Sequence, residues 1–130
     1  MSGSIARERT RSATVLIVED EVFVRMIGAD ALEEAGYSVI EAACADEALA
    51  VLEGADDVEV LFTDIRMPGS MDGLKLAEVV HKRWPAIRIL LTSGDMRPTG
   101  ADIPDEGRFL AKPYRFESLS RELTTLLEHH

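Results

Sequence analysis

The chain has 130 residues, a formal net charge of −10, and 46% hydrophobic and 29% charged residues. This length and composition predict one globular domain with a core of its own, and the negative charge argues against sequence-independent DNA binding, which requires a cationic surface. The single cysteine, Cys44, excludes an internal disulfide and a thiolate metal cluster. No apolar run approaches the roughly 18 residues that span a membrane, so we expect a cytoplasmic protein.

Two terminal segments are set apart from the predicted domain. Residues 1–12 are polar and charged, and we expect them to form a disordered, solvated tail. Residues 128–130 resemble the start of an expression tag, so His129 and His130 are not expected to be ligands. The folded domain is therefore predicted to span residues 13–127.

Short apolar runs alternate with helical patterns along the chain. In chain order, strands are predicted at residues 15–18, 37–41, 58–62, 87–91 and 109–111. Apolar side chains at helical spacing fill the intervals, and the first three helices are expected to end at Gly36, Gly54 and Pro85. The predicted core-facing residues of the four helices are, in order, Val24, Ile27, Ala31 and Ala35; Ala48, Leu49 and Leu52; Leu76, Ala77, Val80 and Trp84; and Phe116, Leu119, Leu123 and Leu126.

This alternation predicts the fold class. Strands that are apolar almost throughout, separated by helices, indicate an α/β fold with a doubly wound parallel sheet covered on both faces. Right-handed crossovers place the loops that follow the strands at one edge of such a sheet. Ligands of these folds bind at that edge, so the residues that follow the strands are the candidate functional residues.

Polar side chains follow four of the predicted strands. Glu19 and Asp20 follow the first strand, Asp64 the third, Thr92 the fourth and Lys112 the fifth. Two like charges about 4 Å apart repel by about 4 kcal/mol at an effective dielectric constant near 20, so the carboxylates need a cation. Oxygen ligands without His or Cys favour Mg²⁺, Mn²⁺ or Ca²⁺ over Zn²⁺. The sequence therefore predicts a hard-metal site at the carboxyl edge.

Each of these features also has a purely structural explanation. The acids of residues 19–21 suit the first turn of a helix, where the helix dipole favours negative charge. Asp64 can be a turn residue, and Lys112 can simply end a strand before Pro113. Their joint occurrence at four strand ends favours the functional interpretation.

Four motifs in this order resemble the receiver domains of response regulators, the phosphoacceptor half of two-component signalling. The motifs are VLIVEDE (15–21), LFTDIRMPGSMDG (61–73), LLTSG (90–94) and FLAKPY (109–114). The resemblance covers residues 13–127 and implies a flavodoxin-like, five-stranded sheet with strand order 2-1-3-4-5.

The resemblance also implies roles for individual residues. Asp64 is expected to accept a phosphoryl group from the phosphohistidine of a sensor histidine kinase. Asp20, Asp64 and the backbone carbonyl of Arg66 are expected to ligate Mg²⁺, for which Mn²⁺ can substitute, while Glu19 acts through water. Oxygen ligands of this kind, with a carboxylate nucleophile, suit phosphoryl transfer.

Three further residues are implied to respond to the phosphoryl group. Lys112 is expected to pair with Asp64 and then with the phosphoryl oxygens. Thr92 is expected to donate its hydroxyl to one of those oxygens, and Phe109 to move with it as the switch residue. The added charge of roughly −1.5 to −2 drives this rearrangement.

The sequence departs from the family pattern in two places. The loop at 67–73 is one residue longer than the usual Met-Pro-x-Met-Asp-Gly. The segment 95–107 contains Pro98, Gly100 and Pro104, which disfavour a helix, so the fourth helix is expected to be absent or reduced to a loop. Both features resemble receivers paired with HWE-family histidine kinases. We expect the edge left without a helix, with the outer face of the final helix, to contact partners.

We therefore predict a stand-alone receiver that signals through protein contacts as a monomer or weak dimer, without nucleic acid or membrane partners. It is expected to be no enzyme beyond its own phosphorylation and slow dephosphorylation. One alternative is a Mg²⁺-dependent phosphatase of the haloacid-dehalogenase type, which needs a second acid where this chain has Arg66. The second alternative is a degenerate receiver that only binds partners, and the complete set of acids, Thr92 and Lys112 counts against it. A receiver cut from a hybrid kinase is also compatible with the sequence.

Overall fold

The computed structural model describes residues 13–95, 97–100, 103–104 and 107–128. The predicted tail at 1–12 and the two terminal histidines lie outside the described residues. Glu128, predicted to belong to a tag, is the last residue of a helix. No helix in the described part of the chain is long and apolar enough to cross a membrane.

Strands and helices alternate as predicted. The strands are β1 (Thr14–Val18), β2 (Ser38–Ala42), β3 (Val58–Asp64), β4 (Arg88–Ser93) and β5 (Arg108–Ala111). The helices are α2 (Val22–Glu34), α3 (Ala45–Gly54), α4 (Gly73–Arg83) and α5 (Phe116–Glu128). The strands are all parallel and lie in the order β2-β1-β3-β4-β5, which confirms the predicted flavodoxin-like sheet.

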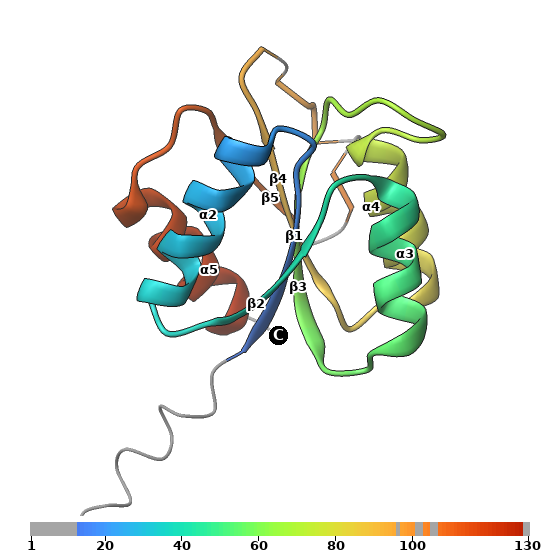
Figure 1. Cartoon of the computed structure of the whole chain (residues 1–130), viewed down its shortest axis with the longest axis horizontal. Coiled ribbons are helices and arrows are strands. Elements are labelled where there is room, and N and C mark those ends of the chain that lie inside the picture. Colours follow the sequence, from blue (N-terminus) through green and yellow to red (C-terminus); the bar gives the residue numbers. More distant parts are fainter. Residues whose placement is uncertain (1–12, 96, 101–102, 105–106, 129–130) are drawn as a thin grey trace, which may run out of the picture.

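Helices cover both faces of the sheet. Figure 1 shows α2 and α5 on one face and α3 and α4 on the other. Successive β1 residues point to opposite faces: Val15 and Ile17 pack beneath α2 and α5, whereas Leu16 and Val18 pack beneath α3 and α4. All five residues of β1 are buried, which explains why the strand is an unbroken apolar run. The carboxyl ends of the strands meet at the top of Figure 1.

The predicted inner face of α2 is partly wrong. Gly28, Ala29 and Leu32 are buried, whereas Ile27 is 68% exposed. A Cβ atom at Gly28 would lie 2.7 Å from Cδ1 of Ile17, so the helix approaches the sheet on the side where a residue has no side chain. Ala31, also predicted, does pack partly against the core beside Leu32. Ile27 was misplaced because Gly28 and Ala29, whose small size permits close packing, carry little hydrophobic signal.

The predicted inner face of α5 needs a smaller correction. Leu119, Leu123 and Leu126 are buried as predicted, but Phe116, at the first turn, is 43% exposed. A first-turn side chain lies at the end of the helix, where the sheet no longer covers it. Phe116 therefore contributes to the surface of the protein and not to its core.

The segment between β4 and β5 contains no helix in its described residues, as predicted from its prolines and glycines. Gly107 ends it in a turn, with its amide donating to the Pro104 carbonyl oxygen at 2.8 Å. Arg97 lies over the ring of Phe109 at 5.9 Å from its centroid. The α4 helix of Figure 1 is the one that follows β3 and does not belong to this segment.

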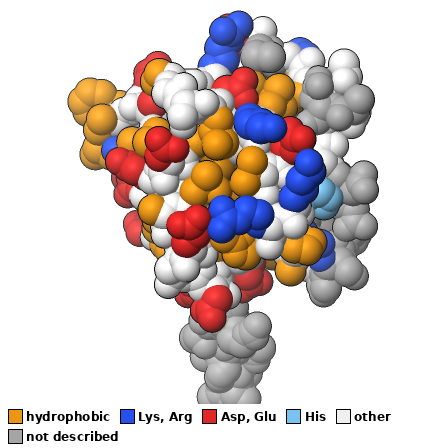
Figure 2. All heavy atoms as spheres, turned by 90° about the vertical axis from the view of Figure 1, so that its right-hand side faces the viewer, with side chains coloured by type: hydrophobic (Ala, Val, Ile, Leu, Met, Phe, Trp, Pro, Cys, Tyr) orange, Lys and Arg blue, Asp and Glu red, His pale blue; other side chains and the backbone are white. Residues whose placement is uncertain are grey.

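The outer face of α3 and α4 is charged. Figure 2 shows this side of the molecule, where acidic and basic side chains surround a few apolar ones. Arg83 of α4 pairs with Glu53 of α3 at 3.1 Å, and Glu78 lies 3.5 Å from Lys75 and 3.6 Å from Lys82. Such exposed pairs make the helix surface hydrophilic and add little to the stability of the fold.

Candidate functional site

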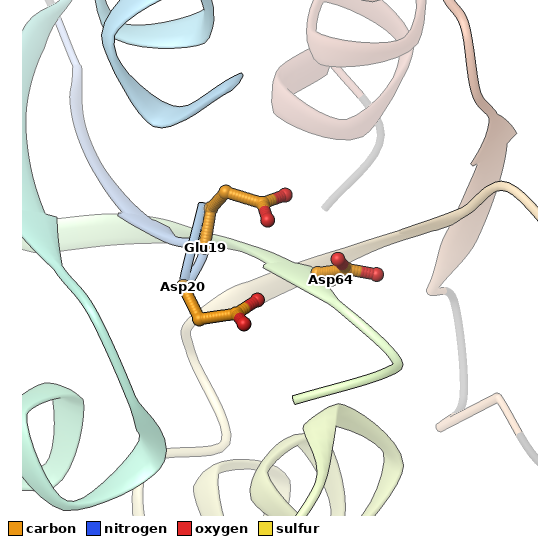
Figure 3. Close-up of side chains that lie close together, drawn as sticks. All are labelled: Glu19, Asp20 and Asp64. Atoms are coloured by element: carbon orange, nitrogen blue, oxygen red, sulfur yellow. The ribbon is translucent and has the colours of Figure 1, made fainter. Parts of the chain in front are cut away.

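Three carboxylates meet at the carboxyl edge of the sheet. Asp64 is the last residue of β3, and Glu19 and Asp20 directly follow β1. One oxygen from each lies within 4.8 Å of the others. Glu19 and Asp64 are buried and Asp20 is exposed, and Figure 3 shows the carboxylates of Glu19 and Asp20 extending from the end of β1 into the space beside Asp64. The parallel strands beneath them fix this meeting point.

Lys112 joins the two buried carboxylates. Its Nζ lies 2.7 Å from Oε1 of Glu19 and 2.9 Å from Oδ2 of Asp64. Backbone amides occupy the other oxygens: Glu21 N–H donates to Oε2 of Glu19 and Arg66 N–H donates to Oδ1 of Asp64, each at 3.2 Å. Both buried charges are thus paired and hydrogen-bonded, the condition under which buried carboxylates are tolerated.

The site favours positive charge. Burial raises the pKa of Glu19, the Asp64 charge adds to this effect, and the hydrogen bonds from Lys112 and Glu21 only partly oppose it. Burial lowers the pKa of Lys112, but its hydrogen bonds to Glu19 and Asp64 outweigh burial and raise it. The ammonium therefore stays charged, and the three clustered carboxylates retain a need for further positive charge. Carboxylate oxygens alone suit a hard divalent cation.

Gly73 holds α4 against the site. Its amide donates to the Ile65 carbonyl oxygen at 2.8 Å, and Asp72 caps the helix by accepting from Lys75 N–H at 2.9 Å. A Cβ atom at position 73 would lie only 1.9 Å from the backbone oxygen of Asp64. Gly73 belongs to one of the four motifs, but no role for it was predicted from the sequence. The available signal was a glycine directly after the N-cap residue Asp72, because most residue types are tolerated at that position unless the backbone packs closely there.

Thr92 lies on the neighbouring strand, paired in register with Asp64. Its Oγ1 is buried and has no hydrogen-bond partner among the described residues. The buried hydroxyl of Thr63, in contrast, donates to the Asp64 carbonyl oxygen at 3.0 Å. An unsatisfied buried hydroxyl costs stability, so the Thr92 hydroxyl is able to donate to a further acceptor beside Asp64.

The structure places the remaining predicted residues around this centre. Phe109 pairs in register with Leu91 and packs partly against the core beneath α3 and α4. Arg66 reaches the carboxylate cluster through its amide, whereas its side chain extends to Asp95 at the surface. The roles assigned to these residues, and to Glu19, Asp20, Asp64, Thr92 and Lys112, remain predictions.

An apolar surface lies beside the site. Its exposed side chains, on α2 and the first turn of α5, are Val22, Phe23, Met26, Ile27 and Phe116. A groove of about 410 Å³ includes Ile27 of this group and is otherwise lined by Val24, Gly94, Lys112, Pro113 and Tyr114. Among the described residues, the large exposed apolar side chains thus lie on α2 and at Phe116 of α5. The expected partner surface at the β4–β5 segment and the outer face of α5 stays a prediction.

Comparison with known proteins gives a consistent picture. The family described as response regulator receiver domain matches residues 15–124. The sensor kinase CckA of Brucella abortus (strain 2308) is 38% identical over 127 residues, which are 95% of this chain and 13% of the kinase. The response regulator receiver protein CpdR of the same strain is 31% identical over 117 residues, 87% of this chain and 95% of that protein. The chain therefore spans only a small part of the kinase but nearly all of CpdR.

Solved structures show the same similarity. The receiver domain of the hybrid histidine kinase CckA superposes with a TM-score of 0.76 at 31% identity, covering 88% of this chain and 99% of that domain. Chemotaxis protein CheY4 of Vibrio cholerae superposes with a TM-score of 0.79 at 29% identity, covering 88% of this chain and 98% of that protein.

Proposed function

Because the chain belongs to the response regulator receiver domain family, we propose that Asp64 accepts a phosphoryl group from the phosphohistidine of a sensor histidine kinase. The observation that carries this proposal is the cluster at the carboxyl edge, in which Asp64 lies beside Glu19 and Asp20 and is bound by Lys112 at 2.9 Å. A carboxylate nucleophile with acids for a metal and one ammonium is the equipment that phosphoryl transfer to Asp requires.

The acids fit Mg²⁺, with Mn²⁺ as a substitute. Asp20, Asp64 and the Arg66 carbonyl would hold the ion directly, and Glu19, which already pairs with Lys112, would act through water. When bound, the metal supplies positive charge that offsets the charge of the transferred group. The three clustered carboxylates, with oxygen donors only, are the feature of this structure that favours such an ion.

The protein's own groups account for the transfer. A carboxylate oxygen of Asp64 forms a bond to phosphorus, the phosphorus–nitrogen bond of phosphohistidine breaks, and the imidazole leaves with the electron pair. Lys112, which holds Asp64 in the resting protein, then pairs with a phosphoryl oxygen, and the unsatisfied hydroxyl of Thr92 donates to another. Movement of Thr92 creates space beside Phe109, which we expect to repack with it.

The product is expected to decay slowly. Hydrolysis needs an oriented water, and Gly94, two residues after Thr92, has no side chain to orient one. In this proposal the protein catalyses only its own phosphorylation and dephosphorylation and does not turn over a separate substrate. A phosphatase of the haloacid-dehalogenase type would need a second acid two places after Asp64, where this chain has Arg66.

One experiment tests the acceptor. Intact-mass measurement after incubation with acetyl phosphate and Mg²⁺ should show one added phosphoryl group, absent in Asp64→Asn. Asp56→Asn, which changes an exposed acid in the segment before β3, is the matched control and should be labelled like the parent. Labelling of Asp64→Asn to the parental level would disprove the assignment, and absence of labelling in the parent would favour a degenerate receiver that only binds partners.

The kinase is expected to approach over the apolar surface. The groove between α2 and the Pro113–Tyr114 segment opens at Lys112, so a partner seated there lies next to the acceptor. Ile27→Asp should slow transfer from the kinase but leave labelling by acetyl phosphate unchanged, and Glu78→Lys on the opposite face should alter neither. An equal effect of Ile27→Asp on both donors would contradict this route. Pairing with an HWE-family kinase, and a monomer or weak dimer, remain predictions.

A further inference from the structure

A charged pair bridges two loops at the rim of the site. Arg66 follows Asp64 by two residues, and Asp95 follows Thr92 by three. Nε of Arg66 lies 3.0 Å from Oδ2 and 3.1 Å from Oδ1 of Asp95. The side chains are 64% and 62% exposed, so the pair sits at the surface and not in the carboxylate cluster.

Each residue of this ion pair is connected to the site through a hydrogen bond near its own backbone. The Arg66 amide donates to the Asp64 carboxylate at 3.2 Å, so its side chain starts beside the proposed acceptor. The Asp95 carboxylate accepts from the Ser93 hydroxyl at 3.2 Å, one residue from Thr92. The Ile65 amide donates to the Thr92 carbonyl oxygen at 2.9 Å, which keeps the two chain segments side by side.

We propose, on the basis of the proposed function, that Arg66 exchanges between two anions. In the resting protein it binds Asp95, and after transfer it binds the phosphoryl group on Asp64. Arg66 is then a phosphoryl-binding residue, and Asp95 is a positioning residue that competes for it. The Arg66–Asp95 pair thereby links the charge on Asp64 to the position of the loop after β4.

The charges and geometry favour this exchange. An exposed ion pair is weak, whereas a phosphoryl group carries roughly −1.5 to −2 charge and three acceptor oxygens. The contacts at 3.0 and 3.1 Å join the Asp95 oxygens to one guanidinium nitrogen, Nε, and not to the paired edge of the fork that binds an anion in a bidentate way. A phosphoryl group can therefore engage the planar fork of Arg66 more completely than Asp95 does.

The exchange has a consequence for the lifetime of the phosphorylated protein. In hydrolysis, a water oxygen forms a bond to phosphorus, the bond between phosphorus and the Asp64 oxygen breaks, and the products are the carboxylate and inorganic phosphate. A guanidinium over the phosphoryl oxygens hinders the approach of that water. Because Asp95 draws Arg66 away, Asp95 should shorten the lifetime, and only while Arg66 is present.

A double-mutant cycle on decay tests this dependence. The parent, Asp95→Asn, Arg66→Gln and the double variant are labelled with acetyl phosphate and Mg²⁺, the donor is removed, and decay is followed by intact mass. Asp95→Asn should lengthen the lifetime by about two- to fivefold, the range that an exposed ion pair supplies. Arg66→Gln should shorten it, the double variant should match Arg66→Gln, and Arg66→Lys should fall between Arg66→Gln and the parent.

The pair formed by Arg83 and Glu53 provides the control. It is also exposed, with a separation of 3.1 Å, but it lies between α3 and α4 on their outer face. Glu53→Gln should leave the lifetime unchanged, since a general effect of removing a surface charge would act there too. Decay of Asp95→Asn at the parental rate, or an equal effect of Asp95→Asn without Arg66, would overturn the exchange alone. A parent that takes up no phosphoryl group would overturn the proposed function and the exchange together.

Discussion

Two neighbouring regions at the carboxyl edge differ in how their polar groups are satisfied. In the acid site, formed by Glu19, Asp64 and Lys112, both buried carboxylates share one ammonium and each accepts a backbone amide. In the β4 end, residues 92–95, the buried Thr92 hydroxyl has no partner among the described residues, and Gly94 and Asp95 are exposed. The buried groups of the acid site therefore already have partners within the protein, whereas the β4 end holds a hydroxyl that the proposed phosphoryl group would recruit.

The largest effect should come from removing the ammonium of the acid site. Lys112→Ala leaves two buried carboxylates without their shared partner and should lower the free energy of unfolding toward the lower end of about 3–5 kcal/mol, since Lys112 is itself partly exposed. Urea denaturation with and without Mg²⁺ measures the loss, and Mg²⁺ should restore more stability to the variant than to the parent. Lys82→Ala, an exposed control on α4, should change it by less than about 0.5 kcal/mol. Equal losses in the two variants would contradict the comparison.

Gly73→Ala tests the close packing of α4 against the backbone of Asp64 in the acid site. The added methyl group would lie 1.9 Å from the Asp64 backbone oxygen, so α4 must shift, at a cost of about 1–3 kcal/mol. Acetyl phosphate labelling should slow as Asp64 moves with its backbone. Gly54→Ala is the matched control, because nothing lies within 4 Å of its Cβ position at the end of α3, and it should be neutral or slightly stabilising. Urea denaturation of both variants decides whether close packing matters at Gly73.

Metal binding tests whether the carboxylates of the acid site repel one another in the absence of a cation. Mg²⁺ at ten times its Kd should stabilise the parent by about 1.4 kcal/mol through mass action. Asp20→Asn should lose most of this gain, and without metal it should be as stable as the parent or more so, because one of the clustered negative charges is gone. Thermal unfolding across a Mg²⁺ titration measures both effects. A melting temperature of the parent that does not respond to millimolar Mg²⁺ would exclude the metal site.

The smallest change in the free energy of unfolding is expected at the β4 end. Its sign should differ between Thr92→Val and the control Thr63→Val. Thr92→Val removes an unsatisfied hydroxyl and should leave the free energy of unfolding unchanged or raise it by about 1 kcal/mol. Thr63→Val removes a hydroxyl that donates to the Asp64 carbonyl oxygen and should lower it by about 1 kcal/mol. Amide hydrogen exchange of residues 92–95 should slow on phosphorylation in the parent but not in Thr92→Val. Equal destabilisation by both substitutions would show that Thr92 is satisfied in the resting protein.

The predicted site depended on strand ends more than on single residues. Glu19, Asp64, Thr92 and Lys112 are far apart in the sequence, yet each follows or ends an apolar strand, and parallel strands bring such positions to one edge. Strand ends therefore locate the cluster without any side-chain detail. The role of Gly73 was missed, because a contact between a helix and the backbone of Asp64 leaves no periodic signal. Helical spacing also placed Ile27 of α2 against the sheet, where the helix presents Gly28, Ala29 and Leu32 instead.

The sequence by itself determined the order of strands and helices, the parallel sheet, the meeting of the acids with Lys112, and the lack of a helix in the described residues between β4 and β5. These features depend on periodicity, on breakers such as Pro98 and Pro104, and on the family motifs, all of which are local in the chain. Only the tertiary structure decided which side of α2 packs, that the Thr92 hydroxyl has no partner among the described residues, and that Arg66 pairs with Asp95. Those outcomes depend on distances between side chains that separate elements position, and no local pattern encodes such distances.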